Sequence, residues 1–307
     1  MMNTLIYWLG RALVEFIGRL PLKWVAWGGR RIGGLMYFID ARHRRVALNN
    51  LTMCFGQEKT PAEITAIARE NFRRLGENYA CTIKTYVMSW EELKPSIELV
   101  GMEHVRPREA GPDAQSRIIA LGHFGLFEIC TRYNQFVPSF HIASTYRALS
   151  PPGLNRLMAE LRNRSGCELF ERRTQGNDLV AMMTRRGAML GLLIDQHAGD
   201  KGLRMNFLGH ECSVSPAAAV FALRYRCPLH VTICYRTGLG RWRIENGKEI
   251  PTTVNGRRRS IVEVTRDVNA AFEAAVRRDP ANWFWVHKRW KPAAPKAAAQ
   301  PSGEAGD

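Results

Sequence analysis

Residues 117–128 read Arg-Ile-Ile-Ala-Leu-Gly-His-Phe-Gly-Leu-Phe-Glu, and this stretch decides the fold. Its apolar run at 118–121 is typical of a buried strand, and Gly122 marks a turn directly after it. The pattern from 124 to about 136 suits a helix, so His123 is expected where a strand ends and a helix begins. In α/β proteins, ligands bind at that edge of the sheet, beside backbone N–H groups that the helix does not use.

The spacing of His123 and Glu128 favours acid–base chemistry. An imidazole can take a proton from a hydroxyl group near neutral pH when a carboxylate fixes its tautomer and stabilises its cation. Glu128 is expected in the first helical turns, within reach of the ring, although a histidine near a glutamate can also be structural. Gly125, at the expected helix start, is a natural source of N–H donors for an oxyanion, with a plain turn as the alternative.

Strand-like and helix-like segments alternate along most of the chain. Strands are expected at 140–144, 167–170, 188–194, 230–235 and 242–245. Helices are expected at 42–55, 60–89, 151–164, 177–186, 216–226 and 260–278. This alternation predicts an α/β sheet with helices on both faces.

The first 40 residues carry the cleanest helical periodicity. Apolar residues at helical spacing line one face, namely Leu5, Trp8, Leu9, Ala12, Leu13, Phe16, Ile17 and Leu20. Arg11, Glu15 and Arg19 lie off this face and interrupt the apolar region, so a signal peptide fits poorly. No charge-free run approaches the ~20 residues that span a bilayer, so a spanning helix is not expected. A second segment after Pro21 combines tryptophans with basic residues. We expect residues 1–40 to form amphipathic helices that associate with a membrane in its plane, with packing on the core as the alternative.

The composition indicates which kinds of partner the protein can bind, but it does not choose among them. The chain has 44 basic and 28 acidic residues, a net charge of +16, which attracts polyanions such as nucleic acid, anionic lipid or an acidic protein. The seven cysteines include no Cys-x-x-Cys pair, so they are expected to be small core residues in a reducing compartment. Residues 41–291 are expected to form the α/β domain, and 292–307 a disordered tail.

Five blocks of the sequence resemble a known family. The His-Phe-Gly-Leu-Phe-Glu segment resembles the His-x4-Asp/Glu motif of glycerolipid acyltransferases, most closely that of the bacterial lipid A biosynthesis (lauroyl/myristoyl) acyltransferase family. The other blocks follow in the family's order between residues 5 and 291. They are Tyr146-Arg147, Arg162 with Arg164, 193–196 followed by 206–209, and 285–290.

The resemblance implies a fold and a reaction. The fold would be a glycerolipid-acyltransferase-like central mixed sheet flanked by helices. The reaction would transfer a fatty acyl chain from acyl carrier protein or acyl-CoA to a hydroxyl of a lipid A precursor or related glycolipid, at the cytoplasmic face of the inner membrane. His123 would be the general base and Glu128 would orient it. Attack on a thioester with the help of a base needs no metal or tightly bound cofactor.

Three further residues are expected to bind substrate. Arg147 and Arg164 suit phosphate recognition, because a guanidinium group can bind a phosphate with two hydrogen bonds. Asp195 ends an apolar strand and would place a carboxylate at the ligand-binding edge of the sheet. With His197 it could instead form half of a metal site, but such a site needs three or four ligands, so we expect no metal.

Departures from the family pattern leave alternatives open. Ala148 stands where the family usually has proline, and His197 where it usually has aspartate. The acceptor could therefore be a lysophospholipid, a mannosylated lipid or a lipoamino acid. A nucleic-acid-binding protein is compatible with the charge, although the chain has no recognisable motif for it. A lipid-binding or scaffold protein without catalysis is a third class, against which the His123 and Glu128 pair argues.

Overall fold

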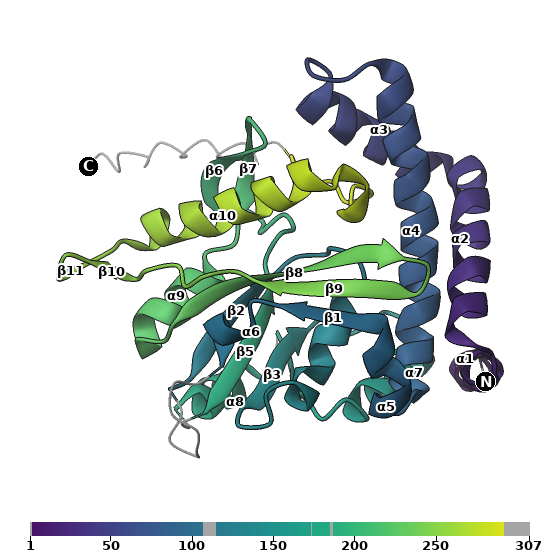
Figure 1. Ribbon diagram of the computed structural model, residues 1–307, viewed down its shortest axis with the longest axis horizontal. Helices are drawn as coiled ribbons and strands as arrows, with labels where there is room; N and C mark the ends of the chain where they lie inside the picture. Colours follow the sequence, from purple (N-terminus) through teal and green to yellow (C-terminus); the bar gives the residue numbers. More distant parts are fainter. Residues whose placement is uncertain (1, 107–114, 173, 185–186, 292–307) are drawn as a thin grey trace, which may run out of the picture.

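The structure is a computed structural model that describes residues 2–106, 115–172, 174–184 and 187–291. The expected disordered tail at 292–307 lies outside the described residues. Figure 1 shows a twisted central sheet with helices on both of its faces, and α2 and α4 side by side along one edge. The predicted mixed sheet flanked by helices is confirmed.

Seven strands form the central sheet, in the order β1-β9-β8-β2-β5-β3-β4. Their bounds are β1 Ile97–Val100, β2 Arg117–Leu121, β3 His141–Tyr146, β4 Glu168–Glu171, β5 Ala188–Leu193, β8 Leu229–Gly238 and β9 Arg241–Asn246. Strands β8, β2, β5, β3 and β4 run parallel, whereas β9 is antiparallel to β8. The carboxyl ends of the parallel strands therefore share one edge, where α/β folds place their ligands.

Strands β2 and β5 lie at the centre and set the position of the site. Every residue of β2 is buried, as expected for an apolar strand with helices on both faces. Leu121, the last residue of β2, pairs with Leu193, the last residue of β5. His123 and Asp195 each follow their strand by two residues, so this register brings them to the same point of the sheet edge.

Helices cover both faces of the sheet, and the N-terminal helices pack along one of its edges. They are α1 Met2–Arg19, α2 Leu22–Ile39, α3 Ala41–Phe55, α4 Pro61–Val87, α5 Trp90–Leu93, α6 Met102–Val105, α7 Pro152–Asn163, α8 Gly176–Met183, α9 Ala217–Tyr225 and α10 Ile261–Arg278. Short 3-10 segments are η1 Lys94–Ser96, η2 Phe127–Gln135 and η3 Pro280–Asn282. The predicted start of α4 is confirmed, with Thr60 and Glu63 forming a capping box.

Several elements differ from the expectation. Strand β1, the hairpin of β6 Leu203–Phe207 with β7 His210–Val214, and the pair β10 Thr253–Val254 with β11 Arg257–Arg258 were not predicted. The segment after His123 is the 3-10 helix η2 instead of an α-helix. It is kinked at Arg132, whose buried guanidinium donates hydrogen bonds to the carbonyls of Thr85 and Met88 on and after α4. These long-range contacts explain the irregular helix.

The apolar stripe of α1 faces away from the protein. Trp8, Leu9 and Phe16 are each about 60% exposed, whereas Tyr7 and Val14 on the other side are buried. The apolar residues of α2 are exposed in the same way, among them Trp24, Trp27, Ile32, Leu35, Phe38 and Ile39. No helix among the described residues is long and apolar enough to cross a membrane. Ile17 and Leu20 pack on the core, but this packing does not account for the exposed apolar residues of the two helices.

Helix α2 is held against α4 by close backbone contact and by charge. A Cβ atom at Gly29 would lie 2.6 Å from the carbonyl oxygen of Gly76 and 2.9 Å from the Cβ of Ala80. Arg30 forms an ion pair with Glu70 at 2.9 Å. The adjacent Gly28 has no atom within 4 Å of where its Cβ would be. The packing of α2 on α4 therefore requires a glycine at position 29 but leaves space for a side chain at position 28.

We predict that Gly29→Ala lowers the free energy of unfolding by about 1–3 kcal/mol, because the new methyl group meets backbone that must shift. The matched variant Gly28→Ala should raise it by about 0.5–1 kcal/mol, because alanine loses less entropy in a helix. Urea unfolding followed by circular dichroism measures both. Equal effects of the two variants would contradict the close packing of α2 on α4.

Candidate active site

The carboxylate of Asp195 contacts His123 twice. The Nδ1 atom of His123 lies 2.7 Å from Asp195 Oδ1, and the backbone N–H of His123 donates to Asp195 Oδ2 at 2.8 Å. Trp283 Nε1 donates to the same Oδ2 at 2.8 Å. Asp195 is 1% exposed, so protein donors replace water around its carboxylate.

The ionisation of Asp195 determines the tautomer of His123. Burial would raise the pKa of Asp195, but the charge and hydrogen bonds of His123, helped by the charge of Arg289, lower it to about 2. Asp195 is therefore ionised at neutral pH and can only accept hydrogen bonds. The Nδ1 atom of His123 must then carry a proton, which leaves Nε2 as the hydrogen-bond acceptor of the ring. The side-chain amide of Gln196 lies 3.3 Å from that Nε2 atom.

The C-terminal segment completes the surroundings of Asp195. Arg289 is fully buried, donates a hydrogen bond to the backbone carbonyl of Asp195, and lies 4.2 Å from the ring centre of Phe207. Burial lowers the pKa of His287 to about 4, so this ring is neutral, and its Nε2 accepts from the backbone N–H of His197 at 3.1 Å. We had not predicted roles for Trp283 or Arg289. Arg289 lies in the block at 285–290 that resembles the family, and Trp283 lies two residues before that block.

Glu128 has partners other than His123. Its carboxylate accepts hydrogen bonds from the Tyr86 hydroxyl at 2.6 Å and from Arg162 Nη2 at 2.5 Å. The expected contact between Glu128 and the imidazole is therefore not formed, and Asp195 takes that place. The reason is geometric, because η2 turns Glu128 towards α4 and α7 while the turn after β2 points His123 at the end of β5.

Gly125 likewise has a structural role. Its φ is 51°, and a Cβ atom would lie 2.5 Å from the carbonyl oxygen of Cys234. Its N–H donates to the carbonyl of Asn282 at 3.0 Å. This N–H is thus unavailable to an oxyanion, and Gly125 does not line the cavity described next. Gly125 is therefore held by backbone contacts away from the cavity wall.

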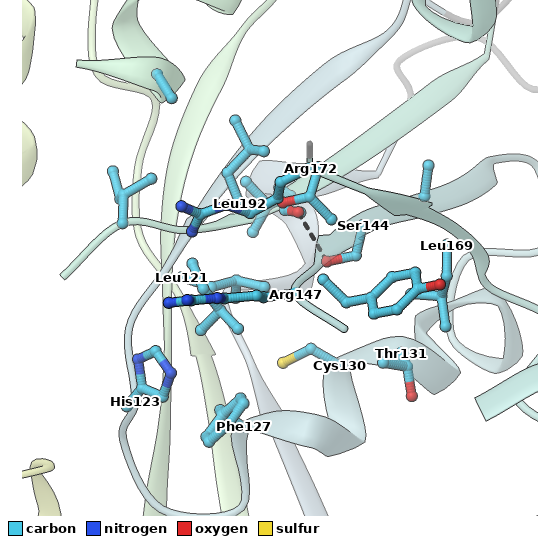
Figure 2. A pocket seen from close by; sticks show the side chains of 18 of the residues that line it. Leu121, His123, Phe127, Cys130, Thr131, Ser144, Arg147, Leu169, Arg172 and Leu192 are labelled. Atoms are coloured by element: carbon cyan, nitrogen blue, oxygen red, sulfur yellow. Dashed lines mark hydrogen bonds between the residues drawn. The ribbon is translucent and has the colours of Figure 1, made fainter. Parts of the chain in front are cut away.

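A cavity of about 710 Å³ opens beside His123. Figure 2 shows the ring of His123 and the guanidinium groups of Arg147 and Arg172 on one side of it. Much of the remaining wall is apolar, formed by Ile119, Leu121, Phe127, Ile142, Leu169, Met189, Leu192, Leu193 and Ile194. The cavity therefore combines a polar, cationic mouth with an interior suited to an apolar ligand.

The four arginines near the site differ in what they can bind. Arg147 is exposed at the cavity, as expected, and has no ion pair among the described residues. Arg172 has the same properties and was missed, because no motif marked it. Arg162 lines the cavity but is paired with Glu128. Arg164 is exposed at the end of α7 and does not line the cavity, so its expected substrate contact is not seen.

No set of three or more His, Cys, Asp or Glu residues within the described ranges is placed to hold a metal ion. The Nε2 atom of His210 lies 2.8 Å from the carbonyl oxygen of Met53. The contact between Asp195 and His123 supports proton transfer. An imidazole fixed by a carboxylate presents its unprotonated Nε2 towards a cavity and can take a proton from a hydroxyl there.

Comparison with known proteins gives a consistent result over nearly the whole chain. The family described as bacterial lipid A biosynthesis acyltransferase matches residues 1–292. The chain is similar to the lipid A biosynthesis palmitoleoyltransferase of Escherichia coli (strain K12), with 23% identity over 294 residues, covering 92% of this chain and 90% of that protein. It is similar to the same extent to the lipid A biosynthesis acyltransferase of Shigella flexneri.

We predict that Asp195→Asn reverses the tautomer of His123. The asparagine oxygen would keep the two N–H donors of the His123 backbone and Trp283, so its amide would donate to Nδ1 and move the ring proton to Nε2. Imidazole 15N chemical shifts report the tautomer directly. Glu128→Gln is the matched control and should leave the wild-type tautomer unchanged. A tautomer that changes in Glu128→Gln but stays unchanged in Asp195→Asn would contradict this geometry.

Proposed function

Because the chain belongs to the family of bacterial lipid A biosynthesis acyltransferases, we propose that it transfers a fatty acyl chain from a thioester to a lipid hydroxyl. The donor is acyl carrier protein or acyl-CoA, and the acceptor is a lipid A precursor or related glycolipid. The observation that supports this reaction is the contact of 2.7 Å between His123 and the buried Asp195 at the mouth of an apolar cavity. Family membership makes the protein an acyltransferase, and this pair supplies the base.

His123 acts first as a base and then as an acid. Its Nε2 takes the proton of the acceptor hydroxyl as the oxygen attacks the thioester carbonyl. Asp195, ionised because its pKa is lowered to about 2, stabilises the imidazolium that forms. When the tetrahedral intermediate collapses, the carbon–sulfur bond breaks and the departing thiolate takes the proton back from Nε2. The acceptor gains an ester, the donor leaves as a thiol, and His123 returns to its starting state.

The lining of the cavity supports a separate place for each substrate. The fatty acyl chain occupies the apolar interior, where burial of its methylene groups favours binding by about 0.8 kcal/mol each. Arg147 and Arg172, exposed at the mouth and without ion pairs among the described residues, bind phosphate groups of the acceptor or donor. The side-chain amide of Gln196, 3.3 Å from His123 Nε2, is placed to donate to the oxyanion.

Glu128 has a positioning role in this proposal. Its ion pair with Arg162 and its hydrogen bond with Tyr86 join η2 to α7 and α4. Both Glu128 and Arg162 line the cavity, so the pair fixes one wall next to the reacting groups. Loss of the Glu128 carboxylate would leave the Arg162 guanidinium without its acidic partner at that wall.

The N-terminal helices place the enzyme at the membrane that holds its acceptor. The exposed apolar faces of α1 and α2 carry tryptophans, and Arg31 lies 5.1 Å from the ring centre of Trp27. Such faces enter the boundary between headgroups and acyl chains of a bilayer while basic residues contact anionic lipid. We place this surface at the cytoplasmic face of the inner membrane, where the thioester donor is available.

We predict that expression in a Gram-negative host without its own late acyltransferases adds one acyl chain to lipid A, seen in mass spectra of extracted lipids. His123→Ala should abolish the added mass, because the base is lost. His141→Ala changes an exposed histidine outside the cavity and should retain the gain.

An added acyl chain on a lipid other than lipid A would support the proposed reaction and identify a different acceptor. No gain on any lipid from folded wild-type protein would contradict the proposed function, as would a gain that survives His123→Ala.

A further inference from the structure

A basic groove lies between α3 and the C-terminal segment, outside the catalytic cavity. It consists of two adjoining hollows of about 360 Å³ and about 530 Å³. The first is lined by Ala41, Arg42, Arg45, Val46, Asn49 and Lys288. The second is lined by Val46, Asn49, Asn50, Lys288, Trp290 and Lys291. We call the two hollows together the α3 groove.

The walls of the α3 groove are fixed by a buried polar contact. Asn50 is 9% exposed, and its side-chain amide donates to the carbonyls of Trp285 and His287, both at 2.9 Å. The ring of Trp285 also packs against Phe55 at the end of α3. These contacts hold the C-terminal segment against α3, so the groove is a formed feature of the fold.

Four cations line the α3 groove. Arg42, Arg45, Lys288 and Lys291 are exposed, and none forms an ion pair among the described residues. The acidic group nearest in sequence, Asp40, already caps α3 through two contacts with His43, at 2.6 Å and 3.0 Å. Four unpaired cations around one concave surface produce a positive potential that favours an anion.

The position of the α3 groove indicates where its anion comes from. Lys291 lines both the groove and the catalytic cavity, so the two sites are neighbours. On the other side, α3 begins two residues after the end of α2, where Phe38 and Ile39 are 63% and 62% exposed. The groove thus lies between an exposed apolar surface and the catalytic cavity, at the level expected for headgroups if that surface enters a bilayer.

We propose that the α3 groove binds the phosphate-bearing headgroup of an anionic lipid beside the catalytic cavity. Guanidinium and ammonium groups are the ordinary ligands of lipid phosphates at a membrane surface. The adjoining apolar end of α2 favours a lipid over an acidic protein, because a lipid alone contacts both surfaces at once. The inference rests on the proposed membrane association, and it adds a second anion site to Arg147 and Arg172.

The test measures binding of the full chain to vesicles by flotation. Vesicles of phosphatidylcholine alone are compared with vesicles that also contain anionic phosphatidylglycerol. In the double variant Arg45→Glu with Lys288→Glu, affinity for the anionic vesicles should fall by at least about tenfold, because each basic residue contributes near an anionic surface. Affinity for phosphatidylcholine should be unchanged, and added salt should reduce the difference.

Two control variants separate the groove from general charge and from the apolar face. Arg224→Glu with Lys248→Glu makes the same change of charge at exposed residues that line neither the groove nor the cavity and have no ion pair among the described residues. It should retain affinity for the anionic vesicles to within about threefold if the groove is specific. Trp24→Glu removes an exposed apolar group of α2 and should weaken binding to both kinds of vesicle.

The outcomes that overturn the proposal are distinct from failure of the acyl-transfer reaction. Equal affinities of the groove variant and its charge control for anionic vesicles would overturn it. So would unchanged vesicle binding combined with lost binding to an acidic carrier protein, which would assign the groove to the donor. His123→Ala should bind vesicles as wild type does, so the groove can be confirmed even if no acyl transfer is found.

Discussion

The buried carboxylate of Asp195 organises the catalytic region. A charge in the interior is stable only if hydrogen-bond donors replace the water that it loses, and Asp195 receives three such bonds. Two come from His123 after β2 and one from Trp283 in the C-terminal segment, while Arg289 donates to the Asp195 backbone. One carboxylate therefore joins the ends of two strands to a segment almost 90 residues further along the chain. The same contacts that satisfy the charge also set the reactive nitrogen of His123.

The role expected of Glu128 belongs to Asp195 in this arrangement, and Glu128 has a different one. Asp195 fixes the tautomer of His123, whereas Glu128 fixes the wall of the cavity through Arg162 and Tyr86. Each acid thus has its own partners, His123 and Trp283 for Asp195 and Arg162 and Tyr86 for Glu128. The cavity beside His123 combines cations with an apolar wall, which suits a substrate that has a phosphate and a fatty chain.

Sequence patterns predicted the position of the site better than its contacts. The apolar run of β2 placed His123 at the carboxyl edge of the sheet, and the end of β5 placed Asp195 at the same edge. Their contact depends on β2 and β5 being neighbours in register, which no local pattern reveals. Glu128 was closer in sequence and was therefore chosen as the partner of His123, although η2 turns it away.

The same limit explains what else was missed around the site. Gly125 was expected to supply N–H donors to an oxyanion, with a plain turn as the alternative, but its N–H donates to the carbonyl of Asn282, a partner that only the folded chain supplies. Arg172 belongs to no motif. It directly follows β4, and it lines the cavity because β4 pairs with β3. Local signals such as capping boxes and apolar runs predict elements, whereas long-range pairing decides which side chains meet.

The rate of acyl transfer by two isosteric variants tests the central claim most directly. Asp195→Asn should lower kcat by about 10⁴-fold, as expected when an imidazole base is held in the wrong tautomer. Glu128→Gln should lower it by no more than about tenfold, because it alters the cavity wall and leaves the base intact. A large loss in Glu128→Gln with near-normal turnover in Asp195→Asn would show that Glu128 activates His123, and would contradict this account.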